Sequence, residues 1–294
     1  MSDKIEYASS GIPQPFHLVR PSIWPLIGAL AAGTLAVGAL LYMHDINLGS
    51  FHFGLKGVLV GLLAVATVMF FWWKDVIHEA VVEKAHSPLA KIGLRYGMLL
   101  FISSEVMFFV AFFWAFFNGS LFPTLAIGHV WPPKGMEVIN AFDMPLLMTM
   151  VLLLSGCTVT WAHYAILHNN RYDAVRGLGA TIMLGMIFLA CQSYEYAHAE
   201  FAFSQNIYSS AFFMATGFHG FHVFVGTCFL VVCYFRAEKG HFTADSHFGF
   251  EAAAWYWHFV DVVWLFLFLC IYFWGNKIGV DHTALYPPNA VVTY

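Results

Sequence analysis

The chain has 294 residues, of which 60% are hydrophobic, 18% aromatic and only 10% charged, and its mean hydropathy is +0.70. A soluble domain is about one quarter charged, so this composition excludes a water-facing surface of ordinary polarity. The formal net charge of -4 provides no basic face for a nucleic acid. These values disfavour a soluble enzyme, a nucleic-acid-binding protein and a disordered chain, and they predict a polytopic membrane protein.

Long apolar stretches recur along the chain. A helix needs about 20 apolar residues to cross the hydrocarbon core of a bilayer. Seven stretches meet this requirement: 23–43, 55–73, 94–117, 144–167, 177–197, 207–235 and 252–274. Four charged residues lie within them, namely Lys56, Glu105, Glu195 and Asp261. The sequence therefore predicts an all-α membrane protein with seven transmembrane helices.

The distribution of Lys and Arg predicts how these helices are oriented. Ten of the 13 basic residues lie on the side of the N terminus, and only Lys56, Lys134 and Lys277 lie on the opposite side. Basic residues are retained on the inner side of a membrane. We therefore expect the N terminus on the inner side, which is the cytoplasm or, in an organelle, the matrix.

Five ionisable residues are predicted to lie near the middle of the membrane: Glu105, His219, His222, His258 and Asp261. His219 and His222 are three residues apart, as are His258 and Asp261, so each pair shares one face of its helix. Ionisable groups are costly at this depth and are candidates for a functional site. These five residues are predicted to form an intramembrane polar network.

Three interpretations of the network are open. It is a metal site, a proton path, or a set of hydrogen bonds that fixes helix packing. Within the bounds given above, no span contains a Glu-x-x-His pattern. The other span faces are too apolar for a continuous proton path, and no span carries a widely spaced histidine pair for haem. The structural interpretation is therefore favoured, with no metal, no catalytic residue and no cofactor in this chain. We expect Glu105 to bind His219.

A second group of residues is predicted to lie at the inner membrane surface. Aromatic and cationic side chains at this depth are typical of contacts with lipid headgroups. The predicted lipid-binding residues are Trp72, Trp73, Lys74, His78, Glu79, His86 and Arg236.

Several long motifs resemble subunit III of cytochrome c oxidase. They are WWKDVI at 72–77, GLRYGM at 93–98, ISSEV at 102–106, FFWAF at 112–116, GFHGFHV at 217–223, FGFEA at 248–252 and AWYWHFVDVVWLF at 254–266. They occur in order between about residue 16 and residue 275, across every predicted span.

This resemblance implies a two-helix bundle and a five-helix bundle with a lipid-filled cleft between them. It implies a non-redox subunit of an oxidase complex that reduces oxygen to water with electrons from cytochrome c and pumps protons. Haem and copper would lie in subunits I and II, and cytochrome c would be only an indirect partner. The chain would stabilise subunit I, bind structural phospholipid and support proton uptake and oxygen access. Glu105 corresponds to the membrane glutamate of the family, and the lipid-contacting positions map onto the seven residues given above.

The division implied for the chain is an N-terminal tail with helices 1 and 2 (1–75), a connecting loop on the inner side (76–93), and helices 3 to 7 with a C-terminal tail (94–294). We also expect His17 at a proton-uptake surface. Mitochondrial members of the family usually have Arg where this chain has Lys74 and His78. The long termini favour a bacterial inner membrane, with the N terminus in the cytoplasm and the C terminus in the periplasm. A stand-alone transporter and a stand-alone metalloenzyme are the alternatives.

Overall fold

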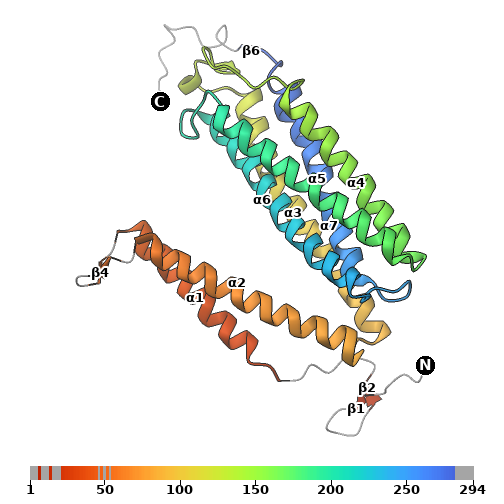
Figure 1. The fold of residues 1–294 in the computed structure, drawn as a ribbon. Coiled ribbons are helices and arrows are strands. Elements are labelled where there is room, and N and C mark those ends of the chain that lie inside the picture. Colours follow the sequence, from red (N-terminus) through yellow and green to blue (C-terminus); the bar gives the residue numbers. More distant parts are fainter. Residues whose placement is uncertain are drawn as a thin grey trace. The chain divides into compact units, whose positions relative to one another are not determined.

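The computed structural model describes residues 21–45 and 54–281, together with the backbone of four two-residue strands outside these ranges. Seven helices in the described part are long and apolar enough to cross a membrane, as predicted. They are α1 (Trp24–Met43), α2 (Gly54–His78), α3 (Pro88–Leu121), α4 (Met144–Leu167), α5 (Arg171–His198), α6 (Ile207–Glu238) and α7 (Phe248–Leu267) (Figure 1).

Short elements extend or connect these helices. Two π-helical segments, η1 (Glu79–Glu83) and η3 (Phe268–Trp274), continue α2 and α7, and η2 (Leu125–Ile127) is a 3-10 turn. Three antiparallel strand pairs are present: β1 (Glu6–Tyr7) with β2 (Pro13–Gln14), β3 (Asn47–Leu48) with β4 (Phe51–His52), and β5 (Val130–Trp131) with β6 (Val280–Asp281).

The segment expected as a loop at 76–93 is mostly helical. Helix α2 runs on through η1 to Glu83, and α3 begins at Pro88, so only residues 84–87 are irregular. The turn is made by Lys84, which has the left-handed φ of 51° and ends η1, and by Pro88, which suits the first turn of a helix. The charged residues between Lys74 and Glu83 therefore lie within a continuous helix, although they were expected in a loop.

The chain divides into two compact units, residues 1–94 and 95–294. In the first unit, α1 packs closely against α2 because small residues face each other. A Cβ atom on Gly38 would lie 2.6 Å from the carbonyl group of Gly57, and one on Gly61 would collide with the backbone of Leu35. Gly57 and Gly61 are four residues apart, the spacing of small residues that lets membrane helices approach each other.

In the second unit, α4 to α7 pack side by side, and most of the largest buried side chains belong to these four helices. Two tryptophans of α7 are fixed by hydrogen bonds to α4. The Nε1 atom of Trp257 donates to Ser155 Oγ, and that of Trp264 donates to Thr149 Oγ1, both over 2.9 Å. These bonds satisfy the only polar atom of each buried indole and fix the register between α4 and α7.

The segments that follow the C-terminal ends of α3 and α7 are tied together by the strand pair β5–β6. Trp131 of β5 is fully buried, packs edge-on against Phe116 of α3, and donates from Nε1 to the carbonyl oxygen of Gly275 over 2.9 Å. This connection holds the end of the segment after α7 within the second unit.

Candidate functional site

Glu105 of α3 contacts His222 of α6 inside the second unit. Glu105 Oε2 lies 2.9 Å from His222 Nε2, and the side chains are 23% and 8% exposed. Phe108 and Phe109 of α3 and Tyr256 and Phe259 of α7 surround the imidazole, with ring centroids 5.0–6.3 Å away. The carboxyl–imidazole pair is therefore enclosed on several sides by aromatic rings.

The hydrogen bond made by the second ring nitrogen of His222 indicates where the protons of this pair lie. Nδ1 lies 2.6 Å from the carbonyl oxygen of Phe218, which can only accept, so Nδ1 carries a proton. In a neutral imidazole, Nε2 then carries a lone pair and can only accept. An ionised Glu105 would place a second lone pair against it, and the two lone pairs would repel each other. One proton must therefore lie between Nε2 and Glu105 Oε2, on either the carboxyl or an imidazolium.

The expected partner of Glu105 was His219, and this expectation is wrong. His219 is fully buried and its Nε2 donates to the carbonyl oxygen of Val260 in α7 over 3.1 Å. Its ring packs between Phe188 of α5 and Trp264 of α7. Three residues correspond to about 300° of helical turn, so His219 and His222 lie on adjoining but different sides of α6 and meet different helices.

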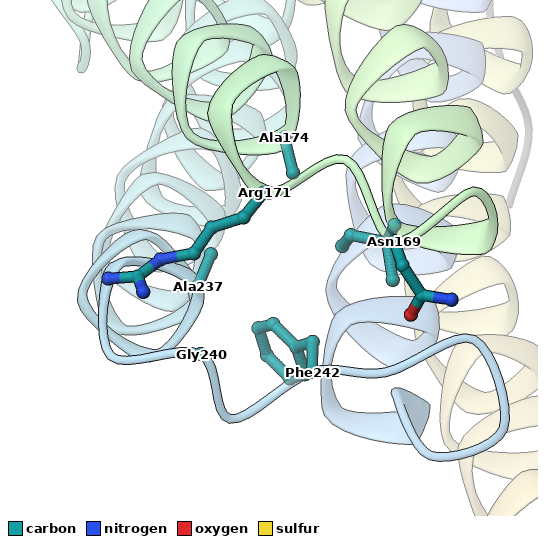
Figure 2. Close-up of a pocket in the computed structure, with 7 residues that line it drawn as sticks. Asn169, Arg171, Ala174, Ala237, Gly240 and Phe242 are labelled. Carbon is teal, nitrogen blue, oxygen red and sulfur yellow. The ribbon is translucent and has the colours of Figure 1, made fainter.

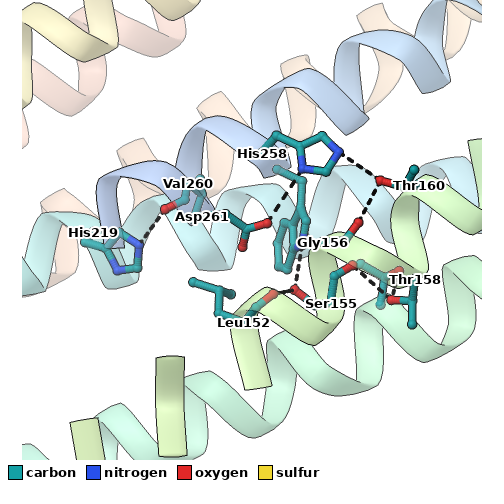
Figure 3. A network of polar contacts seen from close by, with 11 residues as sticks. Leu152, Ser155, Gly156, Thr158, Thr160, His219, His258, Val260 and Asp261 are labelled. Carbon is teal, nitrogen blue, oxygen red and sulfur yellow. Dashed lines mark hydrogen bonds and ion pairs between the residues drawn. The ribbon is translucent and has the colours of Figure 1, made fainter. Parts of the chain in front are cut away.

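His258 and Asp261 of α7 form a third contact (Figure 3). His258 Nδ1 lies 3.7 Å from Asp261 Oδ2, and its Nε2 lies 3.3 Å from Thr160 Oγ1 of α4. The Thr160 hydroxyl donates to the carbonyl oxygen of Gly156, so it accepts from His258 Nε2. Gly156 provides the space for the carboxyl, because a Cβ atom there would lie 2.5 Å from Asp261 Oδ2.

The five residues predicted as one network thus occupy three local contacts. Within residues 21–45 and 54–281, no direct hydrogen bond joins the Glu105–His222 pair, the His219–Val260 bond and the His258–Asp261 pair. Each contact connects two different helices or fixes one face of α7. The Glu105–His222 pair and the His258–Asp261 pair can each hold a proton, and the three contacts hold the helices in register. The functional role of the residues stays a prediction.

A further buried polar cluster was not singled out from the sequence. Glu195 of α5 accepts from the Tyr272 hydroxyl over 2.6 Å, and the Gln192 amide lies 3.4 Å from the same oxygen. All three side chains are buried. The signal was present, since Glu195 is one of the few charged residues in a span, but its tyrosine partner is 77 residues away and only the fold brings them together.

A small pocket opens where α4 ends, α5 begins and α6 ends (Figure 2). Phe242, Ala174 and Ala237 contribute to its wall, and Asn169 and Arg171 provide its polar side chains. The Asn169 side-chain oxygen already accepts from the backbone of Ala244 over 3.1 Å. The pocket therefore lacks a set of converging reactive groups.

Comparisons with known proteins agree on one family. The profile described as "Cytochrome c oxidase subunit III" matches residues 14–276. Similar proteins named cytochrome c oxidase subunit 3 come from Prototheca wickerhamii and Arabidopsis thaliana, each 53% identical over 89% of this chain and 98% and 97% of those proteins. Another, from Branchiostoma lanceolatum, is 52% identical over 90% of this chain and 98% of its own length.

The chain belongs to the cytochrome c oxidase subunit III family. It is therefore a subunit of an oxidoreductase complex of the respiratory chain, and its partners are other subunits of that complex. Members of the subunit III family leave the metal centres of the oxidase to other subunits.

The prediction of a bacterial inner membrane is wrong. The relatives from an alga, a plant and an animal point to the mitochondrial inner membrane for this member of the subunit III family. The error came from the length of the termini, which are the parts of a chain that vary most freely and are least constrained by packing. With this correction, the distribution of Lys and Arg predicts the N terminus in the matrix.

The residues predicted to bind lipid lie at several surfaces. Trp72 and Trp73, near the end of α2, are 37% and 58% exposed, and Lys74 and His78 are exposed beside them. Glu79 and His86 are half-buried. His17, predicted at the proton-uptake surface, lies outside the described residues.

Arg236, the remaining predicted lipid ligand, is partly enclosed near the end of α6. Its guanidinium carbon lies 4.5 Å from the centre of the Phe242 ring, and the group fits against Gly249, where a Cβ atom would collide with it. The Nε atom is buried and has no hydrogen-bond partner in the described part of the chain.

Proposed function

We propose that this chain is the non-redox third subunit of the oxidase, which stabilises subunit I, holds structural phospholipid and supports proton uptake and oxygen access. Haem and copper would be carried by subunits I and II, and cytochrome c would donate electrons without contacting this chain. Family membership supports the place of the chain in the complex. The finer roles rest on the side chains discussed below.

Phospholipid binding is supported above all by Arg236. A guanidinium presents a planar fork that matches phosphate oxygens, and one of its nitrogens, Nε, is buried here without a partner. The ring of Phe242 covers one face of the group. Such an arrangement suits a phosphate at the membrane surface, with acyl chains along apolar helix faces.

The test is the phospholipid content of the oxidase complex purified in mild detergent. We expect Arg236→Gln to reduce the phospholipid retained per haem. Arg176→Gln is the matched control, because Arg176 also stacks on an aromatic ring, with its guanidinium 3.9 Å from the Tyr172 centroid, but is exposed. Equal lipid content in wild type and Arg236→Gln would contradict the assignment of this residue.

Association with subunit I is supported by the large apolar surface that the helices leave uncovered. Leu100 and Trp114 of α3 are 72% and 74% exposed, which suits contact with lipid or with another membrane subunit. Affinity purification of this chain should therefore recover a haem-containing partner. A colourless chain that is active alone would instead indicate a transporter or a separate enzyme.

Proton uptake and oxygen access are the remaining proposed roles. Oxygen is apolar and partitions into lipid, so phospholipid bound to this chain would favour its delivery to subunit I. His17 is proposed to lie near a proton-uptake entrance, an assignment that rests on the sequence alone. Proton uptake by the complex should change in His17→Ala, and unchanged uptake at every pH would remove this residue from the proposal.

A further inference from the structure

Three potential metal ligands converge in the second unit, where α4 ends and α7 begins. His163 lies near the end of α4, His247 immediately precedes α7, and Glu251 lies in the first turn of α7. One ligand atom from each residue lies within 4.8 Å of the other two. They are the only such group of histidine, cysteine and acidic residues among the described residues.

The hydrogen bonding of His247 leaves one ring nitrogen available. Its Nδ1 lies 2.9 Å from the carbonyl oxygen of Thr243, which can only accept, so Nδ1 carries the proton. Nε2 then holds a lone pair in the neutral ring. The side chain is only 6% exposed, and Nε2 is buried without a hydrogen-bond partner. A buried polar atom without a partner requires an explanation.

The nearest group to this nitrogen is a carboxylate oxygen. Nε2 of His247 lies 3.5 Å from Glu251 Oε1. Nε2 has no donor facing it, and Glu251 is 14% exposed, so a proton or a metal ion between the two atoms would satisfy both lone pairs. The third group, the imidazole of His163, has its ring centroid 5.5 Å from that of His247 and adds a second nitrogen donor.

We propose that His163, His247 and Glu251 bind a divalent transition-metal ion of the Zn²⁺ type. Two imidazoles and a carboxylate form a ligand set typical of zinc, with a fourth position left for water. Donor atoms around a tetrahedral zinc ion are about 3.3 Å apart. The His247–Glu251 separation of 3.5 Å already matches this spacing. The half-buried His163 offers a third donor atom within 4.8 Å of the other two, and its imidazole would move closer when the ion binds.

Groups next to the ligands orient His247 and Glu251. The Thr243 carbonyl fixes the tautomer of His247, which is the usual role of a carbonyl behind a metal-bound histidine. Arg95 holds the Glu251 carboxylate with two hydrogen bonds, from Nε to Oε2 over 2.9 Å and from Nη2 to Oε1 over 3.1 Å. The guanidinium also places a positive charge beside the site, so we expect weaker binding than at a site with anionic ligands alone.

The test is equilibrium dialysis of radioactive Zn²⁺ against the purified oxidase complex after treatment with a chelator. The wild type should bind one more equivalent of Zn²⁺ than His247→Ala, or bind it at least about tenfold more tightly, because even outer-shell substitutions weaken metal sites by this much. His163→Gln should show the same loss and is a second variant, because His163 is half-buried whereas His247 is buried.

His168→Ala is the matched control. His168 also lies at the end of α4 and hydrogen-bonds through Nδ1 to the carbonyl four residues earlier, over 2.9 Å, but it is exposed and outside the cluster. Its variant should bind Zn²⁺ as the wild type does. Equal binding by the wild type and either cluster variant, or an equal loss in His168→Ala, would overturn the proposal and leave a proton between His247 and Glu251.

Discussion

Replacing Glu105 with glutamine or with leucine should have clearly different consequences. His222 Nδ1 donates to the Phe218 carbonyl, so a single proton joins Nε2 to Glu105 Oε2, 2.9 Å away. A glutamine amide can donate to Nε2 without any charge and preserves the bond. A leucine offers no donor and leaves the nitrogen unpaired among aromatic rings.

The expected magnitudes follow from burial. Glu105→Leu strands the Nε2 atom of a side chain that is only 8% exposed, which costs about 1–3 kcal/mol. The 23% exposure of Glu105 does not lower this cost, because a side chain at the predicted mid-membrane depth faces lipid chains or another subunit instead of water. Glu105→Gln should cost less than about 1 kcal/mol, since hydrogen bonds between membrane helices contribute about 0.6 kcal/mol on average.

The measurement is the free energy of unfolding of the chain in the purified complex, obtained by titration with a denaturing detergent. The Glu105→Leu/His222→Phe double variant completes a thermodynamic cycle, and we expect a coupling of at least about 0.5 kcal/mol because the residues are in direct contact. Equal destabilisation by glutamine and leucine, together with no coupling, would refute the proton-sharing contact.

Three other changes test the packing and the inner surface. Gly156→Ala should destabilise the second unit by about 1–3 kcal/mol, because its Cβ would meet Asp261 Oδ2. Gly61→Ala should weaken α1–α2 packing by a similar amount, because the new methyl group would collide with the Leu35 backbone. Burial lowers the pKa of His241, with Arg236 and Lys239 adding to the effect. Stability should therefore fall as pH drops below about 6.5, and His241→Gln should reduce this loss.

Matched controls separate these effects from general sensitivity to substitution. Gly179→Ala in α5 meets only Tyr234 at 3.6 Å, and Gly33→Ala in α1 meets nothing within 4 Å. Detergent unfolding should leave both near the wild-type value, and a loss as large as that of the test variants would contradict the packing argument. For His241, the decisive result is the slope of stability against pH. An unchanged slope in His241→Gln would show that another group titrates.

The sequence was most informative where a single chemical property repeats along the chain. Apolar stretches long enough to cross a bilayer predicted all seven helices, and the motif around Trp257, His258 and Asp261 indicated the family. The sequence was less informative about where each helix ends and about which membrane holds the protein. Charged residues after Lys74 suggested a loop although the backbone continues as a helix to Glu83, and terminal length suggested the wrong membrane.

The number of helices, their membrane-spanning length and the ionisable residues within them were determined by sequence alone, because lipid imposes a length and a polarity on each span. Which of these residues meet was decided only by the tertiary structure. His219 and His222 are chemically equivalent in the sequence, and their order along α6 carries no information about the neighbouring helix. The rotation of α6 against α3 and α7 assigns Glu105 to His222 and the Val260 carbonyl to His219. The same packing brings His163 to His247 and Glu251 across 84 residues of sequence.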